Sequence, residues 1–564
     1  MAEKLKIIPL GGLNEIGKNM TVLEYGKDII IIDCGLGFPE DDMYGVDLVI
    51  ADMTYLVKNQ EKIRGMFLTH GHEDHIGSIP YAMQQFNCPI HGTRLTAGLV
   101  KLKLEEHHLE RKVKLFTHEA GEVVKAGCFQ VEFIHVNHSI ADAVAFAVKT
   151  PVGTLVFSGD FKIDAMAEDG MIDLARFAQL GQEGVLLLMA DSTNAERPGY
   201  TQTEQKVNAT FDALFARAEA NKKRLIIATF ASNISRVQQI INCAEKYGRK
   251  VALSGRSMVN VMSIASELGY LKVPDGVLID LNMISRYTKE QIVLITTGSQ
   301  GEPMSALTRM AFADHRQVAV GEDDMIIISA RPIPGNEKMV ANVVNKLYEK
   351  GAKVIYSDIA DIHVSGHACQ EELKLIHSLI KPKYFMPVHG EYRHLKHHAL
   401  LAQELGLPSN HIFILENGDA LTYNKKRFSI TKGFAPAEAV FVDGLGVGDV
   451  GSIVLRDRKM LSEAGLIVVV AALDVAVLLD FREVRVRHAQ LLTLINIRCA
   501  AHKMDRCRQH LGAFLPVGRV AAKAADRTGL VMVAPEYGIP AVLYLHSLLP
   551  GAEEILQLHQ VGGH

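Results

Sequence analysis

The chain has 564 residues, of which 48% are hydrophobic and 22% charged, as in an ordinary globular protein of three or four domains. Its formal net charge of −4 excludes a globally basic nucleic-acid binder, so any contact with a polyanion must be local. The seven cysteines are odd in number and irregularly spaced, which argues against a disulfide framework and for a reducing compartment. Because the N-terminus does not resemble a signal peptide and the longest apolar runs are too short to span a bilayer, we expect a cytoplasmic protein without a membrane part.

The first 85 residues predict a β-meander that leads to a metal site. Apolar runs separated by glycine turns predict strands over 5–10, 20–23 and 29–33. The stretch His70-Gly71-His72-Glu73-Asp74-His75 then places three imidazoles and two carboxylates within six residues. The sequence of residues 76–85 predicts a helix after it. Histidine and carboxylate are ordinary ligands of Zn²⁺, and a solvated loop has no need of three histidines. We therefore favour a metal site over a polar loop.

Four further predicted strands each end at a histidine or an aspartate. The strand ends are His138 after 131–137, Asp160 after 154–159, Asp191 after 185–190 and His389 after 383–388. Because ligands collect at strand ends in sheets flanked by helices, we expect these side chains to share one site with the stretch at 70–75.

The residue types at these strand ends suggest two metal ions. We assign His70, His72 and His138 to one ion, Asp74, His75 and His389 to the other, and Asp160 to a bridge between them. Seven ligands for two ions leave room for a bound water, as a catalytic site requires, and ligands without thiolate fit Zn²⁺ best, with Mn²⁺ as the alternative. Such a pair polarises a phosphoryl or carbonyl oxygen and activates water.

Between about 195 and 345 the pattern becomes that of a separate α/β domain with a parallel sheet. Predicted helices and strands alternate over 203–221, 224–229, 235–247, 250–254, 258–269 and 291–296. Because the strand that ends at His389 returns to the site afterwards, this domain interrupts the first one. The loop at 298–303 is either a plain turn or a phosphate cradle.

A second motif, His363-Val364-Ser365-Gly366-His367, shortly precedes the His389 strand. A histidine near the metals could donate a proton to a leaving oxygen, and Ser365 with nearby backbone amides could hold phosphate oxygens. A loop whose histidines cap a helix is an equal interpretation of these residues alone. Five other histidines lie in charged helical surroundings and are predicted to be solvated, at 107, 108, 394, 397 and 398.

In combination, these motifs resemble a known fold. The 70–75 stretch with His138, Asp160 and His389 resembles the metallo-β-lactamase fold, and the inserted domain resembles its β-CASP branch, which processes nucleic acids. Four longer sequence motifs are similar to those of the bacterial ribonuclease J family, and the resemblance covers about residues 5–474. They are Asp191-Ser-Thr-Asn-Ala-Glu-Arg-Pro-Gly199, Thr297-Gly-Ser-Gln-Gly-Glu-Pro303, Pro332-Ile-Pro-Gly-Asn-Glu337 and His363-Val-Ser-Gly-His-Ala368.

The resemblance implies an α/β protein, with a metallo-β-lactamase αββα sandwich at 1–195 and 346–450, a β-CASP insertion at 196–345 and a linker at 451–474. It implies two Zn²⁺ per subunit and a ribonuclease that degrades RNA 5′ to 3′ from 5′-monophosphate ends and also cuts internally, in mRNA decay and rRNA maturation. It implies assembly as a homodimer or homotetramer. It also implies catalytic roles for His367, Asp74 and Asp191, and substrate contacts from His363, Ser365, Gly366 and His367.

Three other functions are compatible with parts of this pattern. A DNA nuclease remains open, because contacts to a 2′-OH cannot be recognised in the sequence. A lactone or thioester hydrolase would not need the insertion with His367. A non-catalytic RNA-binding scaffold would be marked by lost ligands, whereas all seven are present.

The segment 475–564 departs from the family. It has eight Arg against two Lys, with six His and two Cys, and lacks amphipathic order. We interpret it as an atypical tail produced by a reading-frame shift, and expect it to be poorly ordered and to impair assembly. The catalytic residues, all before residue 390, would be spared.

Overall fold

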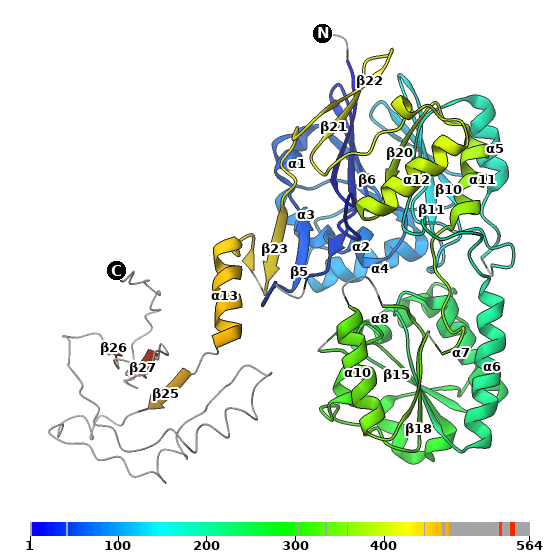
Figure 1. The fold of residues 1–564 in the computed structure, drawn as a ribbon, viewed down its shortest axis with the longest axis vertical. Helices are drawn as coiled ribbons and strands as arrows, with labels where there is room; N and C mark the ends of the chain where they lie inside the picture. Colours follow the sequence, from blue (N-terminus) through cyan, green and yellow to red (C-terminus); the bar gives the residue numbers. More distant parts are fainter. Residues whose placement is uncertain are drawn as a thin grey trace. The chain divides into compact units, whose positions relative to one another are not determined.

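The structure is a computed structural model. It describes residues 3–40, 43–167, 169–302, 304–332, 336–357, 359–444, 446–464, 468–472, 530–532 and 542–546. The chain divides into two compact units. The first comprises Met1–Asp41 and Val46–Asp449, and the second comprises Asp42–Gly45 and Val450–His564. All the predicted site residues belong to the first unit, which holds both the metallo-β-lactamase part and the insertion (Figure 1).

An eight-stranded sheet forms the first layer, in the order β22-β21-β1-β2-β3-β6-β7-β8. Its strands are β1 (Leu5–Gly11), β2 (Met20–Tyr25), β3 (Asp28–Ile32), β6 (Ile63–Phe67), β7 (Ile90–Thr93), β8 (Leu115–His118), β21 (Ala420–Tyr423) and β22 (Phe428–Thr431). The antiparallel β1–β2–β3 meander confirms the predicted strands, and β6 then pairs in parallel with β3. The helix predicted over 76–85 is instead split into α2 (Glu73–Ile76) and α3 (Ile79–Gln85), because Pro80 suits only the first turn of a helix.

A six-stranded sheet forms the second layer, in the order β20-β13-β12-β11-β10-β9. Its strands are β9 (Val123–Ala126), β10 (Phe129–His135), β11 (Val144–Thr150), β12 (Gly153–Phe157), β13 (Val185–Asp191) and β20 (Tyr384–Val388). The two sheets pack face to face, with Phe67 of β6 against Phe133 and Phe146 at ring-centroid distances of 6.3 and 6.1 Å. This inner core is mainly apolar, as an interface between two sheets requires, and His91 stacks on Phe67 within it.

Helices cover the outer faces of both sheets. Helices α5 (Leu174–Glu183), α11 (Gln370–Ile380) and α12 (Tyr392–Glu404) pack their apolar sides on the second sheet, through residues such as Phe177, Ile376 and Leu401. Helices α3 and α4 (Arg94–Glu106) contribute to the core against the first sheet. This is the αββα sandwich that the family resemblance implied (Figure 1).

The insertion is a parallel sheet with helices on both faces, drawn in green in Figure 1. The strand order is β16-β15-β17-β14-β18-β19, and all these pairs are parallel. The bounds are α6 (Glu204–Ala220), β14 (Arg224–Ala228), α7 (Ile234–Lys246), β15 (Lys250–Ser254), α8 (Arg256–Glu267), β16 (Leu278–Ile279), β17 (Ile292–Thr296), α9 (Ala306–Ala311), β18 (Asp324–Ile328), α10 (Glu337–Glu349) and β19 (Lys353–Ile355). The predicted alternation up to β17 is confirmed, whereas α9, β18, α10 and β19 were not predicted.

The sequence of residues 420–474, with turn glycines as in Asp443-Gly444-Leu445-Gly446, predicts a strand-rich segment, and the structure differs from this prediction in part. Strands β21 to β24 are present, with β23 (Ala439–Asp443) and β24 (Gly446–Val447) joining a small sheet with β4 (Leu36–Gly37) and β5 (Leu48–Ala51). Residues 452–464 form helix α13 instead of strands, because this stretch has no Gly or Pro and is rich in Arg, Lys, Leu and Glu.

In the second unit, β25 (Val468–Ala472) pairs with β27 (Val542–His546), which pairs with β26 (Leu530–Met532). The rest of the predicted tail at 475–564 lies outside the described residues. Within the described part of the chain, no helix is long and apolar enough to cross a membrane.

Candidate metal centre

The predicted site residues follow strands of both sheets. In the second sheet, β12, β13 and β20 are parallel neighbours, so Asp160, Asp191 and His389 come to the same edge. The turn after β6 brings residues 70–75 to this edge from the first sheet, and His138 follows β10. The fold therefore brings together side chains that lie up to about 320 residues apart in the sequence.

One group consists of His70, His72 and His138, whose ring nitrogens face one another. Nδ1 of His72 lies 3.0 Å from Nε2 of His70 and 3.1 Å from Nε2 of His138. Burial lowers the pKa of His72 to about 4 and the pKa values of His70 and His138 well below the usual range. All three rings are therefore neutral at pH 7 and offer lone pairs to a common centre.

A second group consists of Asp74, His75, Asp160 and His389. Oδ2 of Asp160 lies 3.2 Å from Nε2 of both His75 and His389. Oδ2 of Asp74 lies 3.5 and 3.8 Å from the same two nitrogens. The four donor atoms thus surround a second centre.

Asp160 also faces the first group. Its Oδ2 lies 3.8 Å from Nε2 of His70 and 3.9 Å from Nε2 of His138. One buried carboxylate oxygen is therefore within 3.9 Å of ring nitrogens from both groups.

The second group is strongly polarised. Burial alone would lower the pKa values of His75 and His389, but nearby carboxylates outweigh it, raising the pKa of His75 well above its usual value and that of His389 to about 9. Burial would likewise raise the pKa of Asp160, yet His389 and His75 hold it well below the usual range. The carboxylates therefore favour positive charge between them, as a cation site does.

Outer hydrogen bonds orient the rings of both groups. Nδ1 of His75 bonds Oδ2 of Asp33 at 2.8 Å, Nδ1 of His389 bonds Oδ1 of Asn19 at 2.9 Å, and Nδ1 of His138 bonds the carbonyl of Gly366 at 2.8 Å. An oxygen partner on Nδ1 fixes the tautomer that leaves Nε2 free to bind a metal. Asp33 is held in turn by the backbone N–H and hydroxyl of Thr69.

The backbone at two of these residues is held in an unusual conformation. Asp33 and His389 have φ values of 61° and 54°, in the left-handed region that residues other than glycine rarely adopt. Such strain persists only where the surrounding structure enforces it, and it gathers at functional sites.

A third group adds Asp191 and His367 beside Asp160 and His389. Nδ1 of His367 bonds Oδ2 of Asp191 at 2.8 Å, and Thr193 donates to the other carboxylate oxygen from its backbone N–H and its hydroxyl. Burial would lower the pKa of His367, but Asp191 outweighs it and raises the pKa. The protonated form of His367 is therefore favoured at the edge of the centre.

In the 363–367 segment, Ser365, Gly366 and His367 lie beside this centre and His363 does not. Oγ of Ser365 accepts from the Asn194 amide at 2.8 Å and from the His367 N–H at 3.2 Å, and Gly366 touches the His138 ring. His363 is not brought to the metal groups. Its Nδ1 has no hydrogen-bond partner, and burial with nearby Arg236 lowers its pKa to about 3.

The prediction of five solvated histidines is wrong in two cases. His108 and His397 are exposed and His107 is half-buried, but His394 and His398 are buried because this side of α12 packs on the second sheet. Nδ1 of His398 bonds Oγ of Ser192 at 3.0 Å, and its Nε2 lies 3.2 Å from Nε2 of His377.

Sequence reasoning gave no role to Asp33, Asn19 or Thr69. Asp33 is the last residue of the predicted strand 29–33 and directly follows the observed strand β3, so the strand-end rule could have included it. Asn19 and Thr69 carry no comparable signal, because their partners are identified only by the folded chain.

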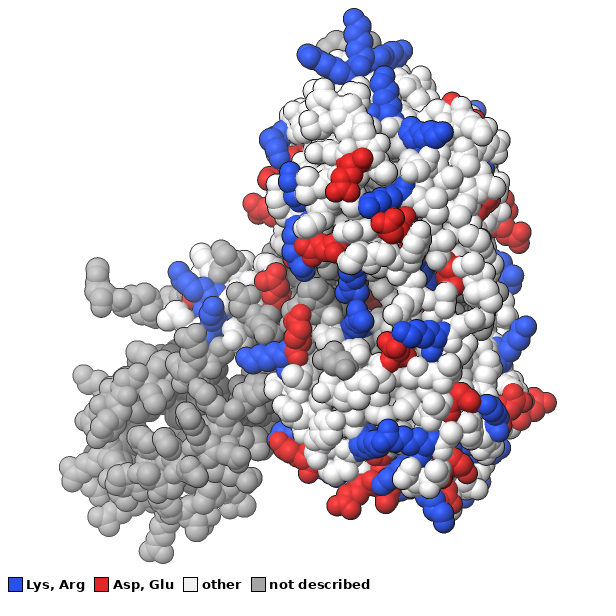
Figure 2. Space-filling view, turned by 45° about the vertical axis from the view of Figure 1, so that its right-hand side comes forward, with Lys and Arg blue, Asp and Glu red and all other residues white. Residues whose placement is uncertain are grey.

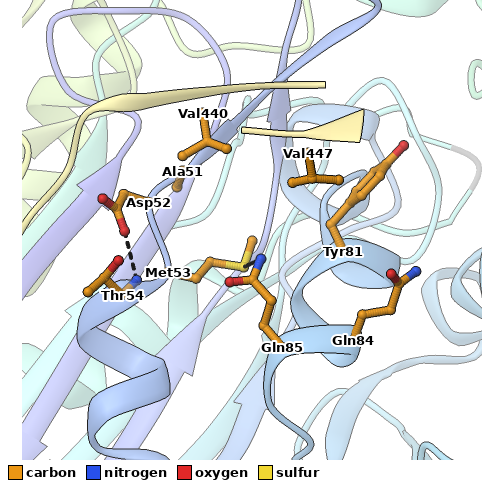
Figure 3. Close-up of a pocket in the computed structure, with 9 residues that line it drawn as sticks. All are labelled: Ala51, Asp52, Met53, Thr54, Tyr81, Gln84, Gln85, Val440 and Val447. Carbon is orange, nitrogen blue, oxygen red and sulfur yellow. Dashed lines mark hydrogen bonds between the residues drawn. The ribbon is translucent and has the colours of Figure 1, made fainter. Parts of the chain in front are cut away.

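Elsewhere, a cavity of about 340 Å³ lies between α3 and the small sheet (Figure 3). Tyr81, Gln84 and Gln85 line it opposite Val440 and Val447, and its lining includes none of the predicted site residues. On the face shown in Figure 2, basic and acidic side chains of the described residues are interspersed rather than separated into large areas of one sign, in keeping with the net charge of −4.

The donor set fits a transition-metal cofactor. Four ligands at 2.0–2.1 Å in a tetrahedron lie about 3.3 Å from one another, close to the separations within the first group. A sandwich of two sheets with such a centre at the strand ends defines a metal-dependent hydrolase of the metallo-β-lactamase superfamily, whose family model matches residues 13–195.

Further comparisons identify the branch of that superfamily. The family models "Ribonuclease J, beta-CASP domain" and "Zn-dependent metallo-hydrolase RNA specificity domain" match residues 222–347 and 351–415. The chain belongs to the ribonuclease J family, and it is a metal-dependent ribonuclease.

Three relatives show the extent of this similarity. The chain is 46% identical to ribonuclease J of Synechocystis sp. over 489 residues, covering 86% of this chain and 76% of the relative. It is 45% identical to ribonuclease J of Thermus thermophilus, with 83% and 82% covered, and 42% identical to ribonuclease J2 of Bacillus subtilis, with 84% of each covered. A crystal structure of a protein of unknown function from Enterococcus faecalis shares the fold, with a TM-score of 0.53 at 17% identity, over 74% of this chain and all of that one.

Proposed function

We propose that the centre holds two Zn²⁺ ions and hydrolyses RNA phosphodiesters. One ion would be held by His70, His72 and His138, the other by Asp74, His75 and His389, with Asp160 shared. The observation that carries this proposal is the single Asp160 oxygen within 3.9 Å of ring nitrogens from both groups. When bound, the ions polarise the phosphoryl oxygens and lower the pKa of a water molecule.

The chain's own residues orient the substrate and move protons. Asp191 raises the pKa of His367 and so favours its protonated form, which would donate a proton to the leaving 3′-oxygen. Asp191 touches no substrate and instead holds the ring. The Ser365 hydroxyl and the backbone beside Gly366 are placed next to this ring and would bind oxygens of the scissile phosphate.

Membership of the ribonuclease J family supports RNA as the substrate. We propose that degradation runs 5′ to 3′ from 5′-monophosphate ends, with internal cleavage as a second mode. His363 lies in the segment 351–415 that matches the RNA specificity domain model, and it would contact this RNA away from the metals.

We also infer that the protein acts in the cytoplasm, in mRNA decay and rRNA maturation. We infer that it assembles as a homodimer or homotetramer. Family membership supports these points. The atypical tail at 475–564 would weaken assembly, so light scattering of the full chain tests the oligomer. Resequencing tests the frame shift, and an intact frame encoding this tail would exclude it.

The central experiment measures degradation of 5′-monophosphorylated and 5′-triphosphorylated RNA by the wild type and by His72→Ala and Asp74→Ala. Both variants should lose at least 100-fold in rate, while the control His397→Ala, an exposed histidine on α12, should match the wild type. Unchanged rates in His72→Ala and Asp74→Ala would refute the metal assignment. Equal cleavage of single-stranded DNA, or hydrolysis of a lactone or thioester in preference to RNA, would refute the substrate assignment.

A further inference from the structure

A buried chain of charges joins the metallo-β-lactamase part to the insertion. It consists of Lys162, which follows Asp160 by two residues, Glu204 at the start of α6, and Arg236 on α7. Lys162 and Arg236 are 2% and 0% exposed, so neither cation is screened by solvent. The sequence alone predicted no functional role for any of these three residues.

At one end, Lys162 is tied to the strands that deliver site residues. Its backbone N–H donates to the carbonyl of Asn137 at 2.8 Å, and Asn137 directly precedes His138. Its Nζ lies 3.3 Å from Oε1 of Glu204 and 3.5 Å from Oδ2 of Asp164. A movement of Lys162 would therefore displace the segments that carry Asp160 and His138.

At the other end, Arg236 is tied to the loop that carries His367. Its Nη2 lies 2.6 Å from Oε2 of Glu204, and its Nη1 donates to Oγ of Ser329 at 2.6 Å and to the carbonyl of Ile362. Ile362 begins the segment that continues through Ser365 to His367. The two oxygens of one carboxylate, that of Glu204, therefore connect the two sides of the site.

Such a network is costly to build. Two cations and two carboxylates lose their hydration, and apolar residues of similar volume would often serve stability as well. Charged pairs fix a relative placement, however, because each partner accepts only a narrow range of positions. The charges balance, and the pKa of Glu204 is lowered, since Arg236 and Lys162 outweigh the effect of its burial.

We propose that Glu204 is a positioning residue for the ribonuclease reaction, joining Lys162 to Arg236 so that the Ser365–His367 loop stands in register with Asp160 and His138. This inference rests on the proposed function. It makes the placement of the proton donor over the metals depend on an ion pair between the two domains. Glu204 itself touches no reacting atom.

The test compares Glu204→Gln with Asp212→Asn. Asp212 is also on α6 and pairs with Lys246 of α7, but both side chains are largely exposed, and neither contacts Lys162. The measurements are zinc content, kcat and KM on 5′-monophosphorylated RNA, and the rate on bis(4-nitrophenyl) phosphate, a diester with a good leaving group that needs no proton donor.

We expect Glu204→Gln to keep its zinc, to lower kcat on RNA at least tenfold with KM within about threefold, and to hydrolyse the small diester within twofold of the wild type. Asp212→Asn should match the wild type in all measurements. If Glu204→Gln matches Asp212→Asn, the inference is wrong. Equal losses on RNA and on the small diester would also overturn it, because the pair would then support the whole metal centre.

A second variant covers a failure of Glu204→Gln to fold. Arg236→Lys keeps a cation beside Glu204 but has one nitrogen in place of the two that bond Glu204 on one side and Ser329 and Ile362 on the other, so the same selective loss on RNA is expected. Wild-type kcat on RNA in Arg236→Lys would overturn the inference. A wild-type protein that neither holds zinc nor cuts RNA would instead refute the proposed function itself, and this inference with it.

Discussion

Replacing Gly366 with alanine should displace His138 from the metal centre. A Cβ built at Gly366 would lie 2.6 Å from Cε1 and 2.7 Å from Nδ1 of His138, and 2.9 Å from Oγ of Ser139. Carbon atoms in contact normally lie about 3.5–4.0 Å apart, so the ring must retreat by roughly 1 Å. The φ of Gly366 is outside the left-handed region, so the substitution acts through this clash and not through backbone strain.

The cost follows from what the ring does. His138 would lose both its approach to Nδ1 of His72 and its own hydrogen bond to the Gly366 carbonyl. A misplacement of about 1 Å at a catalytic centre costs on the order of 100-fold in rate, which is about 2.7 kcal/mol. Loss of an outer partner lowers metal affinity by roughly 10- to 100-fold. We therefore expect Gly366→Ala to lose both zinc affinity and kcat.

The assay is a zinc titration against a competing chelator, paired with kcat on 5′-monophosphorylated RNA. Gly321→Ala is the matched control, since a Cβ there meets nothing within 4 Å and its φ is ordinary. It should leave both quantities unchanged. Wild-type zinc affinity and kcat in Gly366→Ala would refute the reasoning, because the clash would then be relieved without moving His138.

Three further predictions concern the same centre. Asp191→Asn removes the charge that raises the pKa of His367, so the decline of kcat with rising pH should move to lower pH, as a pH–rate profile would record. Asp33→Asn weakens the bond that orients His75 and should lower zinc affinity roughly 10- to 100-fold in a chelator titration. Dialysis against a chelator should abolish RNA cleavage, and added Zn²⁺ should restore it.

Each of these has an outcome that contradicts it. The alkaline limb of Asp191→Asn could stay where it is in the wild type, and His367 would then not be the proton donor. Asp33→Asn could bind zinc as tightly as the exposed-histidine control His397→Ala, and the orienting bond would then be dispensable. Full RNA cleavage by metal-free protein would exclude metal-dependent hydrolysis.

Much of the fold was predictable because local signals agreed with it. The β1–β3 meander and the α/β alternation up to β17 follow from periodicity and turn residues over short windows. The single helix predicted over 76–85 was wrong because the prediction did not take Pro80 into account. Helix α13 was not predicted because the turn glycines before residue 450 were taken to indicate further strands.

The site was predictable at the level of residue types but not of outer contacts. His138, Asp160, Asp191 and His389 lie at or shortly after strand ends, and residues 70–75 form a dense local motif, so the sequence itself marks them. Asp33 supports His75 from 42 residues away, and Arg236 reaches Ile362 over 126 residues, so no local pattern indicates either contact. His394 and His398, by contrast, were misjudged for an avoidable reason, because they lie four residues apart on the buried face of α12.

The central claim is that two metal ions share Asp160, and elemental analysis of zinc per chain tests it most directly. The wild type should hold two zinc ions per chain, and Asp160→Ala should hold fewer and lose RNA cleavage, with His397→Ala unchanged at two. Two zinc ions per chain and full RNA cleavage in Asp160→Ala would contradict the account.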